Sequence, residues 1–163
     1  MTERLEIRKL SIEDLGDFHQ IHGDRALMEQ IPAPVCTREE SADQLTSIIS
    51  AYEVDGHRLR VWGAFLKHSG PFVGVCASIG SAGPQRDIGY RIVKERWGRG
   101  FGTELTAGLI GYLKRDDAIK TLTARVDPHN TASIKILDRY MTFAEKVYNH
   151  EIHKDELHYE LHF

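Results

Sequence analysis

The sequence predicts an α/β protein built on one mixed, mostly antiparallel, twisted sheet that carries helices on both faces. Two observations predict this class. Segments rich in β-forming residues at 59–66 and 72–79 are separated by a short turn, which indicates an antiparallel hairpin. The stretch 88–140 then alternates strand and helix patterns, an order typical of a sheet covered by helices. The length of 163 residues fits one domain over 1–163.

The first third of the chain is predicted to hold one strand and mainly helices. Leu5–Leu10 alternates apolar and polar residues, as a half-buried strand does. Ser11 has an acidic residue three positions later, and Thr37 is followed at the same spacing by Glu40, which is the spacing of a helix capping box. These signals predict a strand at 5–10, a helix at 11–23, a helical turn at 26–28, and a helix from 37 to near 56.

The rest of the chain is predicted from β-forming runs, apolar periodicity and turn residues. A helix with an apolar side follows a glycine-rich stretch, and Asn130 is suited to cap the last helix. The expected elements are strands at 59–66, 72–79 and 88–93, a helix at 102–115, a strand at 121–126, a helix at 131–140, and a closing hairpin of 143–148 and 156–161.

Composition excludes several classes of protein. A net charge of −3 gives no reason to expect nucleic-acid binding, and no apolar run approaches the roughly 18 residues of a membrane span. The N-terminus is charged at once and lacks an apolar signal core, so we expect a cytoplasmic protein whose Cys36 and Cys76 are free thiols. We expect no metal site among the nine histidines. Those of the C-terminal hairpin are His150, His153, His158 and His162, and their spacing does not put three of them on one strand face.

The segment Trp97–Glu104 carries the clearest functional signal. Three glycines alternate there with an arginine and an aromatic residue, between the strand at 88–93 and the helix that starts near Gly102. Exposed N–H groups and the helix dipole make such a strand–turn–helix junction an anion site. The segment therefore predicts a ligand that carries phosphate.

Other interpretations of this turn remain open from the residues alone. It lacks the lysine and the spacing of a P-loop. Its Gly98-x-Gly100-x-Gly102 is one residue short of the dinucleotide fingerprint, although Asp127 could mimic the ribose-binding acid. The glycines could also serve the turn alone.

Residues 93–104 resemble the cofactor motif of the GNAT superfamily of N-acetyltransferases, Gln/Arg-x-x-Gly-x-Gly/Ala, with Trp97 in the first position. That tryptophan is similar to the RimJ/RimL branch, which acetylates the N-termini of ribosomal proteins. The opening Thr2–Leu5 with Arg8, the Asp87–Tyr90 segment and the Asn130-x-x-Ser133 spacing also resemble this branch, in order along nearly the whole chain.

The resemblance implies a GNAT fold that binds acetyl-CoA and no metal. The pyrophosphate would lie on the N–H groups of the glycine turn, with Arg96 or Arg99 adding charge, and the pantetheine arm would pair with the edge of the strand before it. The cofactor-binding residues implied in this way are Arg91, Ile92, Val93, Arg96, Trp97, Gly98, Arg99, Gly100, Phe101, Gly102, Thr103, Asn130 and Ser133.

The resemblance also implies direct attack of an amine on the thioester, which needs a base and a proton for the thiolate. Asp87 corresponds to the family's base, acting directly or through water, although the residue is equally suited to pair with Arg86 or Arg91. Leu137 stands where many relatives have a proton-donating tyrosine, so Ser133 is the better candidate donor.

We therefore expect an N-acetyltransferase for a protein N-terminus or a small amine, acting as a monomer or a homodimer. The alternative is a GNAT-fold module that binds CoA without catalysis. The segment 138–143 favours keeping this alternative open, since it has one more residue than the family pattern and no glycine to end the last helix.

Overall fold

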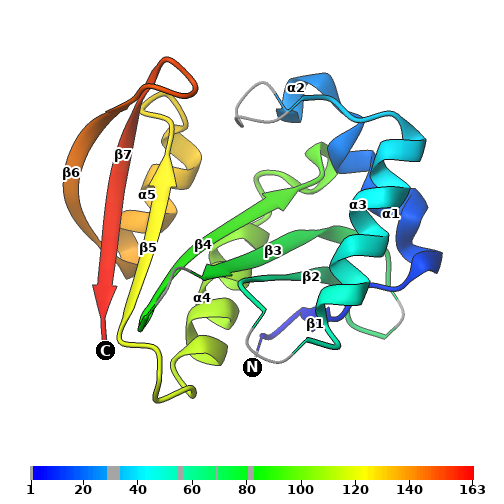
Figure 1. Cartoon of the computed structure of the whole chain (residues 1–163), viewed down its shortest axis with the longest axis horizontal. Helices are drawn as coiled ribbons and strands as arrows, with labels where there is room; N and C mark the ends of the chain where they lie inside the picture. Colours follow the sequence, from blue (N-terminus) through cyan, green and yellow to red (C-terminus); the bar gives the residue numbers. More distant parts are fainter. Residues whose placement is uncertain (1, 29–33, 55–56, 69, 81–82) are drawn as a thin grey trace.

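The computed structural model describes residues 2–28, 34–54, 57–68, 70–80 and 83–163, and Figure 1 shows its arrangement. The strands are β1 (Leu5–Arg8), β2 (Leu59–Leu66), β3 (Phe72–Gly80), β4 (Gln85–Ile92), β5 (Thr121–Val126), β6 (Thr142–Asn149) and β7 (Lys154–His162). The α-helices are α1 (Leu15–His22), α2 (Arg25–Met28), α3 (Arg38–Ala51), α4 (Phe101–Leu113) and α5 (Thr131–Tyr140), and short 3₁₀ turns cover Ile12–Asp14 and Lys94–Arg96.

The strands form one 7-stranded sheet in the order β1-β2-β3-β4-β5-β7-β6. Every neighbouring pair is antiparallel except β4 and β5, which are parallel because α4 crosses over between them. Helices α1 and α3 cover one face, and α4 and α5 cover the other (Figure 1). The predicted fold class is confirmed.

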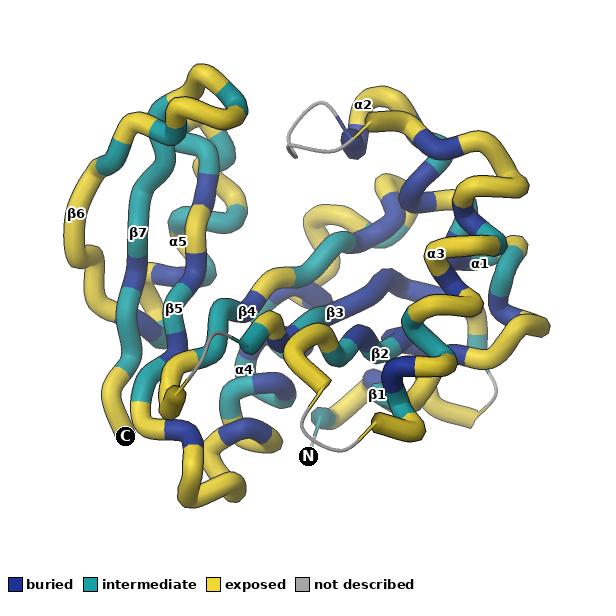
Figure 2. The backbone as a smooth tube through the Cα atoms, in the orientation of Figure 1, coloured by how far each residue is buried: buried dark blue, intermediate teal, exposed yellow. Residues whose placement is uncertain are grey.

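The two faces have separate apolar cores. On the α4 and α5 face, the core contains Leu105 and Leu122, both completely buried. On the α1 and α3 face, it contains Phe18 and Leu45. Figure 2 shows the buried residues concentrated along β2, β3 and the inner sides of these helices, whereas β6 is mostly exposed.

Most predicted elements are present, with shifted ends. The predicted first helix begins as a 3₁₀ turn, and α3 ends at Ala51 rather than near Gly56, which lies outside the described residues. Tyr52 follows α3 and turns inward, where its hydroxyl accepts from the Leu10 N–H at 3.0 Å and donates to the Val61 carbonyl. The absent glycine after α5 is replaced by an extended residue, Met141, which is buried and leads directly into β6.

Strands β4 and β5 pair over only part of their length. Their register covers Gln85–Asp87 against Thr121–Thr123, after which the strands diverge, as Figure 1 shows. Helix α5 and the β6–β7 hairpin then lie on the far side of the opening. This divergence leaves the second half of β4 with an edge that no strand of the described residues covers.

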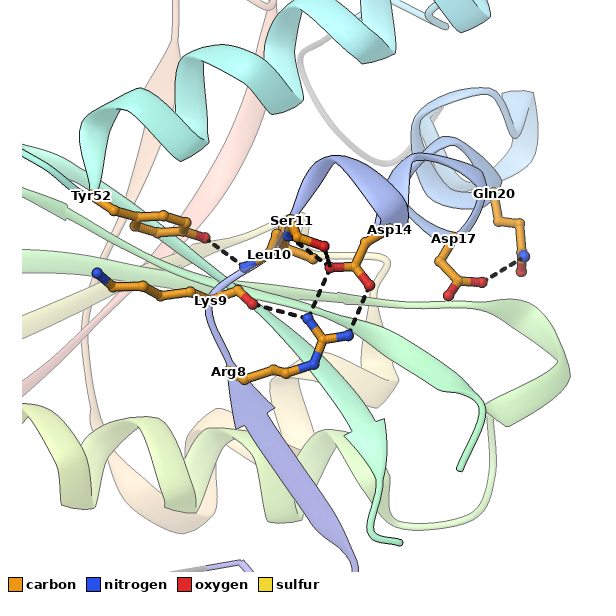
Figure 3. A network of polar contacts seen from close by, with 8 residues as sticks. All are labelled: Arg8, Lys9, Leu10, Ser11, Asp14, Asp17, Gln20 and Tyr52. Atoms are coloured by element: carbon orange, nitrogen blue, oxygen red, sulfur yellow. Dashed lines mark hydrogen bonds and ion pairs between the residues drawn. The ribbon is translucent and has the colours of Figure 1, made fainter. Parts of the chain in front are cut away.

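A polar network joins β1 to the first helical turn (Figure 3). The Arg8 guanidinium donates to both oxygens of Asp14 at 2.8 Å, and the Ser11 N–H donates to the same carboxylate at 2.7 Å. The capping box that the Ser11–Asp14 spacing predicts is therefore present. The Arg8 hydrogen bonds, more than any other contact, lower the pKa of Asp14.

We expect Asp14→Asn to lower the free energy of unfolding by about 2 kcal/mol at pH 7, because a largely buried, doubly bonded carboxylate is lost. A lowered folded-state pKa stabilises the fold above the carboxyl's ordinary pKa and loses this effect as pH falls through the folded value. Urea unfolding of both proteins at pH 7 and near pH 3 should show the difference shrinking in acid.

Asp17→Asn is the control for this prediction. Burial raises the pKa of Asp17, so this carboxylate destabilises the fold at neutral pH, and its amide should be neutral or slightly stabilising. Equal losses of stability in the two variants at pH 7 would contradict the assignment of Asp14.

Candidate active site

A cavity of about 1220 Å³ lies where β4 and β5 diverge. Its lining comes from the end of α1, one side of α3, both diverging strands, the start of α5 and the β6–β7 loop. We call it the central cavity. The ionisable and other polar residues that line it include His22, Asp43, His57, Cys76, Asp87, Tyr90, Arg91, Arg125, Asp127, Asn130, Ser133, Glu151, Lys154, Asp155 and Glu156.

The glycine turn lies beside the central cavity, at the start of α4. Gly98 and Gly100 have φ angles of 71° and 79°, which explains their identity, since other residues rarely adopt this region. Gly102 is required for a different reason. A Cβ there would lie 2.8 Å from the Ile136 side chain, so the glycine lets α5 approach α4.

The backbone of this turn is a set of free donors. Within the described part of the chain, the N–H groups of residues 98–103 donate to no protein acceptor, and the first bonded amide is that of Glu104, which donates to Gly100 at 3.1 Å. They stand at the positive end of a 13-residue helix. This geometry suits a diphosphate.

Arg4 and Glu104 hold the turn against β1. The Glu104 carboxylate accepts from the N–H of Arg4 at 2.6 Å, from that of Leu5 at 3.1 Å, and from the Arg4 side chain at 2.8 Å. Arg4 also donates to the Arg99 carbonyl at 3.0 Å and lies 4.4 Å from the Phe101 ring centre. Arg4 lies in the Thr2–Leu5 segment and Glu104 ends the Trp97–Glu104 segment, and only the fold shows that these two segments meet.

We expect Glu104→Gln to lower the free energy of unfolding by about 1.5 kcal/mol at pH 7, because an amide NH₂ cannot accept these bonds. Burial alone would raise the pKa of Glu104, but the bonds from Arg4 and Leu5 outweigh it and lower the pKa. The stabilisation should therefore be present above the ordinary glutamate pKa and be lost as pH falls through the folded value.

Thermal unfolding of Glu104→Gln should be compared with that of Glu95→Gln, an exposed glutamate in the preceding turn. If both variants unfold at the same midpoint temperature as the wild type at pH 7, the proposed support of the turn by Glu104 is wrong.

The edge of β4 presents alternating backbone groups to the opening. The Val93 N–H donates to Val73 on β3 at 3.0 Å, so the N–H groups of Ile92 and Tyr90 point to the opposite, uncovered side. The Ile92 carbonyl on that side accepts from the Trp97 indole at 2.7 Å. Trp97 thus connects the glycine turn to the end of the strand edge.

Asn130 and Ser133 occupy the other wall. Asn130 caps α5, with its side-chain oxygen accepting from the Ser133 N–H at 3.1 Å, as predicted. The Ser133 hydroxyl oxygen accepts a hydrogen bond from Tyr90, also at 3.1 Å. Burial raises the pKa of Tyr90, which therefore keeps its proton at neutral pH. Sequence reasoning missed this pair, because residues 43 positions apart give no local signal.

Asp87 is held by β5. Arg125 donates to one carboxylate oxygen at 2.8 Å, and the Thr123 hydroxyl donates to the other at 3.1 Å. The predicted pairing with Arg86 or Arg91 is wrong, because the register of β4 and β5 places Thr123 opposite Asp87 and Arg125 next along the same face. Asp87 nevertheless lines the central cavity.

Most of the predicted site residues fall into two groups. Asp87, Arg91, Asn130 and Ser133 line the central cavity, whereas residues 96–103 form the adjoining turn. Ile92 and Val93 belong to neither group and are buried at the end of β4. Gly102 links the two groups, because a Cβ there would lie 3.4 Å from the Tyr90 ring. Within the described ranges, no three acidic, histidine or cysteine residues are placed to hold a metal ion, and no helix has the length and apolarity of a membrane span.

Comparisons with known proteins agree with this arrangement. An uncharacterized N-acetyltransferase, p20, from Bacillus licheniformis is 28% identical over 139 residues, which cover 84% of this chain and 78% of the relative. A GNAT-family acetyltransferase from Bacillus anthracis has a similar structure, with a TM-score of 0.85, 20% identity, and coverage of 99% of this chain and 96% of that one.

The fold is also similar to that of RimL, a ribosomal L7/L12 α-N-protein acetyltransferase solved with CoA. The TM-score is 0.86 at 17% identity, over 99% of this chain and 96% of RimL. The sequence model of the acetyltransferase (GNAT) domain family matches residues 4–140, which are most of the chain. This protein belongs to the GNAT family of acetyltransferases.

Proposed function

We propose that this protein transfers an acetyl group from acetyl-CoA to a primary amine, a small amine or a protein N-terminus, in a ternary complex. The observation that carries the proposal is the junction of three features at one place: the uncovered β4 edge, the free N–H groups of residues 98–103, and the Tyr90–Ser133 pair. The RimL similarity supports this branch of the family, and the two free cysteines fit a cytoplasmic protein.

Acetyl-CoA would supply an activated acetyl group as a thioester. The turn residues would bind the pyrophosphate, with Arg96 and Arg99 adding positive charge. The pantetheine arm would pair with the open edge of β4 through the N–H groups of Tyr90 and Ile92, much as a strand pairs with a sheet edge, because the N–H groups of Arg91 and Val93 face β3. Asn130 and Ser133 would form the opposite wall. The backbone N–H groups of β4 suit the pantetheine arm, because the amides of the strand and of the arm both need hydrogen bonds where water is partly excluded.

Two groups of the chain would move protons. Asp87 retains lone pairs beyond those bonded to Arg125 and Thr123, so it can hold the acceptor ammonium and take its proton through water. Ser133 would donate to the departing thiolate as it accepts the proton of Tyr90, and Tyr90 and the water beside Asp87 would then be restored by proton exchange with solvent. No covalent enzyme intermediate is needed.

The test mixes the protein with acetyl-CoA and a panel of amines and peptides, and records free thiol over time. Acceptor-dependent release above the no-acceptor rate is expected for at least one amine, with Ser133→Ala as the matched control. Saturable CoA binding without release across the panel would contradict transfer and favour a binding module. Failure to bind CoA would contradict both.

A further inference from the structure

Arg91 is a half-buried arginine that pairs with no carboxylate of the described residues. Three other arginines each pair with a carboxylate at 2.8 Å: Arg4 with Glu104, Arg8 with Asp14, and Arg125 with Asp87. Within the described ranges, the side chain of Arg91 has one hydrogen-bond partner, the imidazole of His22, whose Nε2 lies 3.0 Å from Nη1. Most donors of this guanidinium therefore remain available.

His22 positions Arg91 without neutralising it. The His22 ring is buried, stacks on Phe18 with ring centres 4.0 Å apart, and its Nδ1 lies 2.9 Å from the Phe18 carbonyl. Nδ1 is thus the protonated nitrogen, and the Nε2 lone pair accepts from Arg91. Burial lowers the pKa of His22, and the nearby Arg91 charge lowers it further, so the ring is neutral at pH 7.

The guanidinium charge is desolvated where it stands. Burial lowers the pKa of Arg91, and the nearby Cys36 acts in the opposite direction without cancelling this effect. A charge removed from water without a counterion is costly, and a bound carboxylate would offset that cost through two parallel hydrogen bonds to the fork of the guanidinium.

Arg91 stands at one end of an open strip of β4 that faces the central cavity. Asp87, Gly89 and Arg91 alternate onto the same face of the strand, the face toward α1 and α3. A Cβ at Gly89 would meet nothing within 4 Å. The strip therefore has a carboxylate at one end, Asp87, and a guanidinium at the other, Arg91, with no side chain between them at Gly89. All three residues line the cavity.

We propose that Arg91, oriented by His22, binds a carboxylate of the acceptor, so that the acceptor is a small amine that also carries a carboxylate. The proposal rests on the proposed acetyl transfer and names its substrate class. The amine end lies toward Asp87, and the chain between the two groups passes over Gly89. Arg91 thereby serves the acceptor, in addition to any backbone contact that its strand makes with pantetheine.

The test compares matched acceptors. Residues 87 and 91 lie about 13 Å apart along the strand, so the acceptors include long ones. β-Alanine, 4-aminobutyrate and 6-aminohexanoate, which separate amine and carboxylate by different lengths, are each measured against the corresponding primary amide at a pH where the fraction of free amine is matched. At least one acid should exceed its amide in kcat/KM by 10-fold or more. Amides that react as well as acids at every length would overturn the proposal.

Variants at Arg91 identify the group that reads the carboxylate. Arg91→Gln should bring the acid-to-amide ratio close to 1, and Arg91→Lys should retain part of it, because lysine keeps the charge without the fork. CoA affinity and thermal stability are measured in parallel. A ratio unchanged in Arg91→Gln would overturn the proposal, as would a variant that loses CoA affinity while keeping the ratio.

A second measurement does not depend on turnover. Calorimetry with the CoA-loaded protein compares N-acetyl-β-alanine and N-acetyl-4-aminobutyrate with their amides, and the acids should bind at least 10-fold more tightly in the wild type but not in Arg91→Gln. Acid-selective binding without any thiol release would contradict the acetyl transfer alone. Absence of acid-selective binding would contradict the assigned carboxylate site, whether or not thiol is released.

Discussion

Replacing Gly100 with aspartate is expected to weaken CoA binding on the order of 100-fold, or about 2.7 kcal/mol. Gly100 is the N-cap of α4, and it lies among the N–H donors that we assign to the pyrophosphate. A carboxylate there would repel the phosphates and would accept from the same N–H groups. Isothermal titration with CoA measures the change.

The fold should tolerate this substitution. Aspartate is a favoured N-cap residue, and the Cβ would make an ordinary 3.5 Å contact with the Arg4 guanidinium. The positive φ costs about 1 kcal/mol for either aspartate or asparagine, which both adopt this region more readily than most residues.

Gly100→Asn is the matched control, because it has the shape and backbone preference of the aspartate without its charge. We expect its CoA affinity to fall by only about 10-fold. Equal affinities in the two variants would show that charge at this position is irrelevant, and the pyrophosphate would then have to lie elsewhere.

Removing the Ser133 hydroxyl is expected to reduce kcat about 100-fold in Ser133→Ala, the range typical of a lost general acid. Tyr90→Phe should reduce kcat about 10-fold, since Tyr90 acts through Ser133 and water can replace it in part. Because the two residues act in series, the double variant should resemble Ser133→Ala alone.

The controls separate chemistry from binding. Ser133→Thr keeps a hydroxyl and should retain most of kcat, while the KM for acetyl-CoA should change little in any of these variants. An ordinary tyrosine loses its proton near about pH 10. Because burial raises the pKa of Tyr90, this residue should stay protonated, and the wild-type kcat should not decline, between about pH 8 and pH 10. Additive losses in the double variant, or full activity in Ser133→Ala, would contradict the relay.

Local sequence signals predicted the elements that local chemistry determines. The Thr37–Glu40 capping box forms, with Glu40 accepting from the Thr37 N–H at 2.7 Å, and Asn130 caps α5. The glycine turn also forms where its residues require it. Such features depend on neighbours within four positions, so they can be recognised in the sequence.

Contacts between distant segments could not be predicted in this way. The partner of Asp87 was predicted on its own strand, but it is Arg125 on β5, 38 positions away. The support of the glycine turn by Arg4, directly before β1, joins residues 100 positions apart. Sheet order and register decide these pairs, and neither is encoded in any single segment.

The sequence by itself determined the fold class, the glycine turn and the family resemblance, because periodicity, backbone preference and capping act over short distances. Only the tertiary structure decided that Tyr90 meets Ser133, and that Arg91 meets a neutral histidine instead of a carboxylate. The physical reason is that strand alternation sends Tyr90 and Arg91 to opposite faces of β4, one toward α5 and the other toward α1. What each side chain can do therefore depends on which helix covers its face.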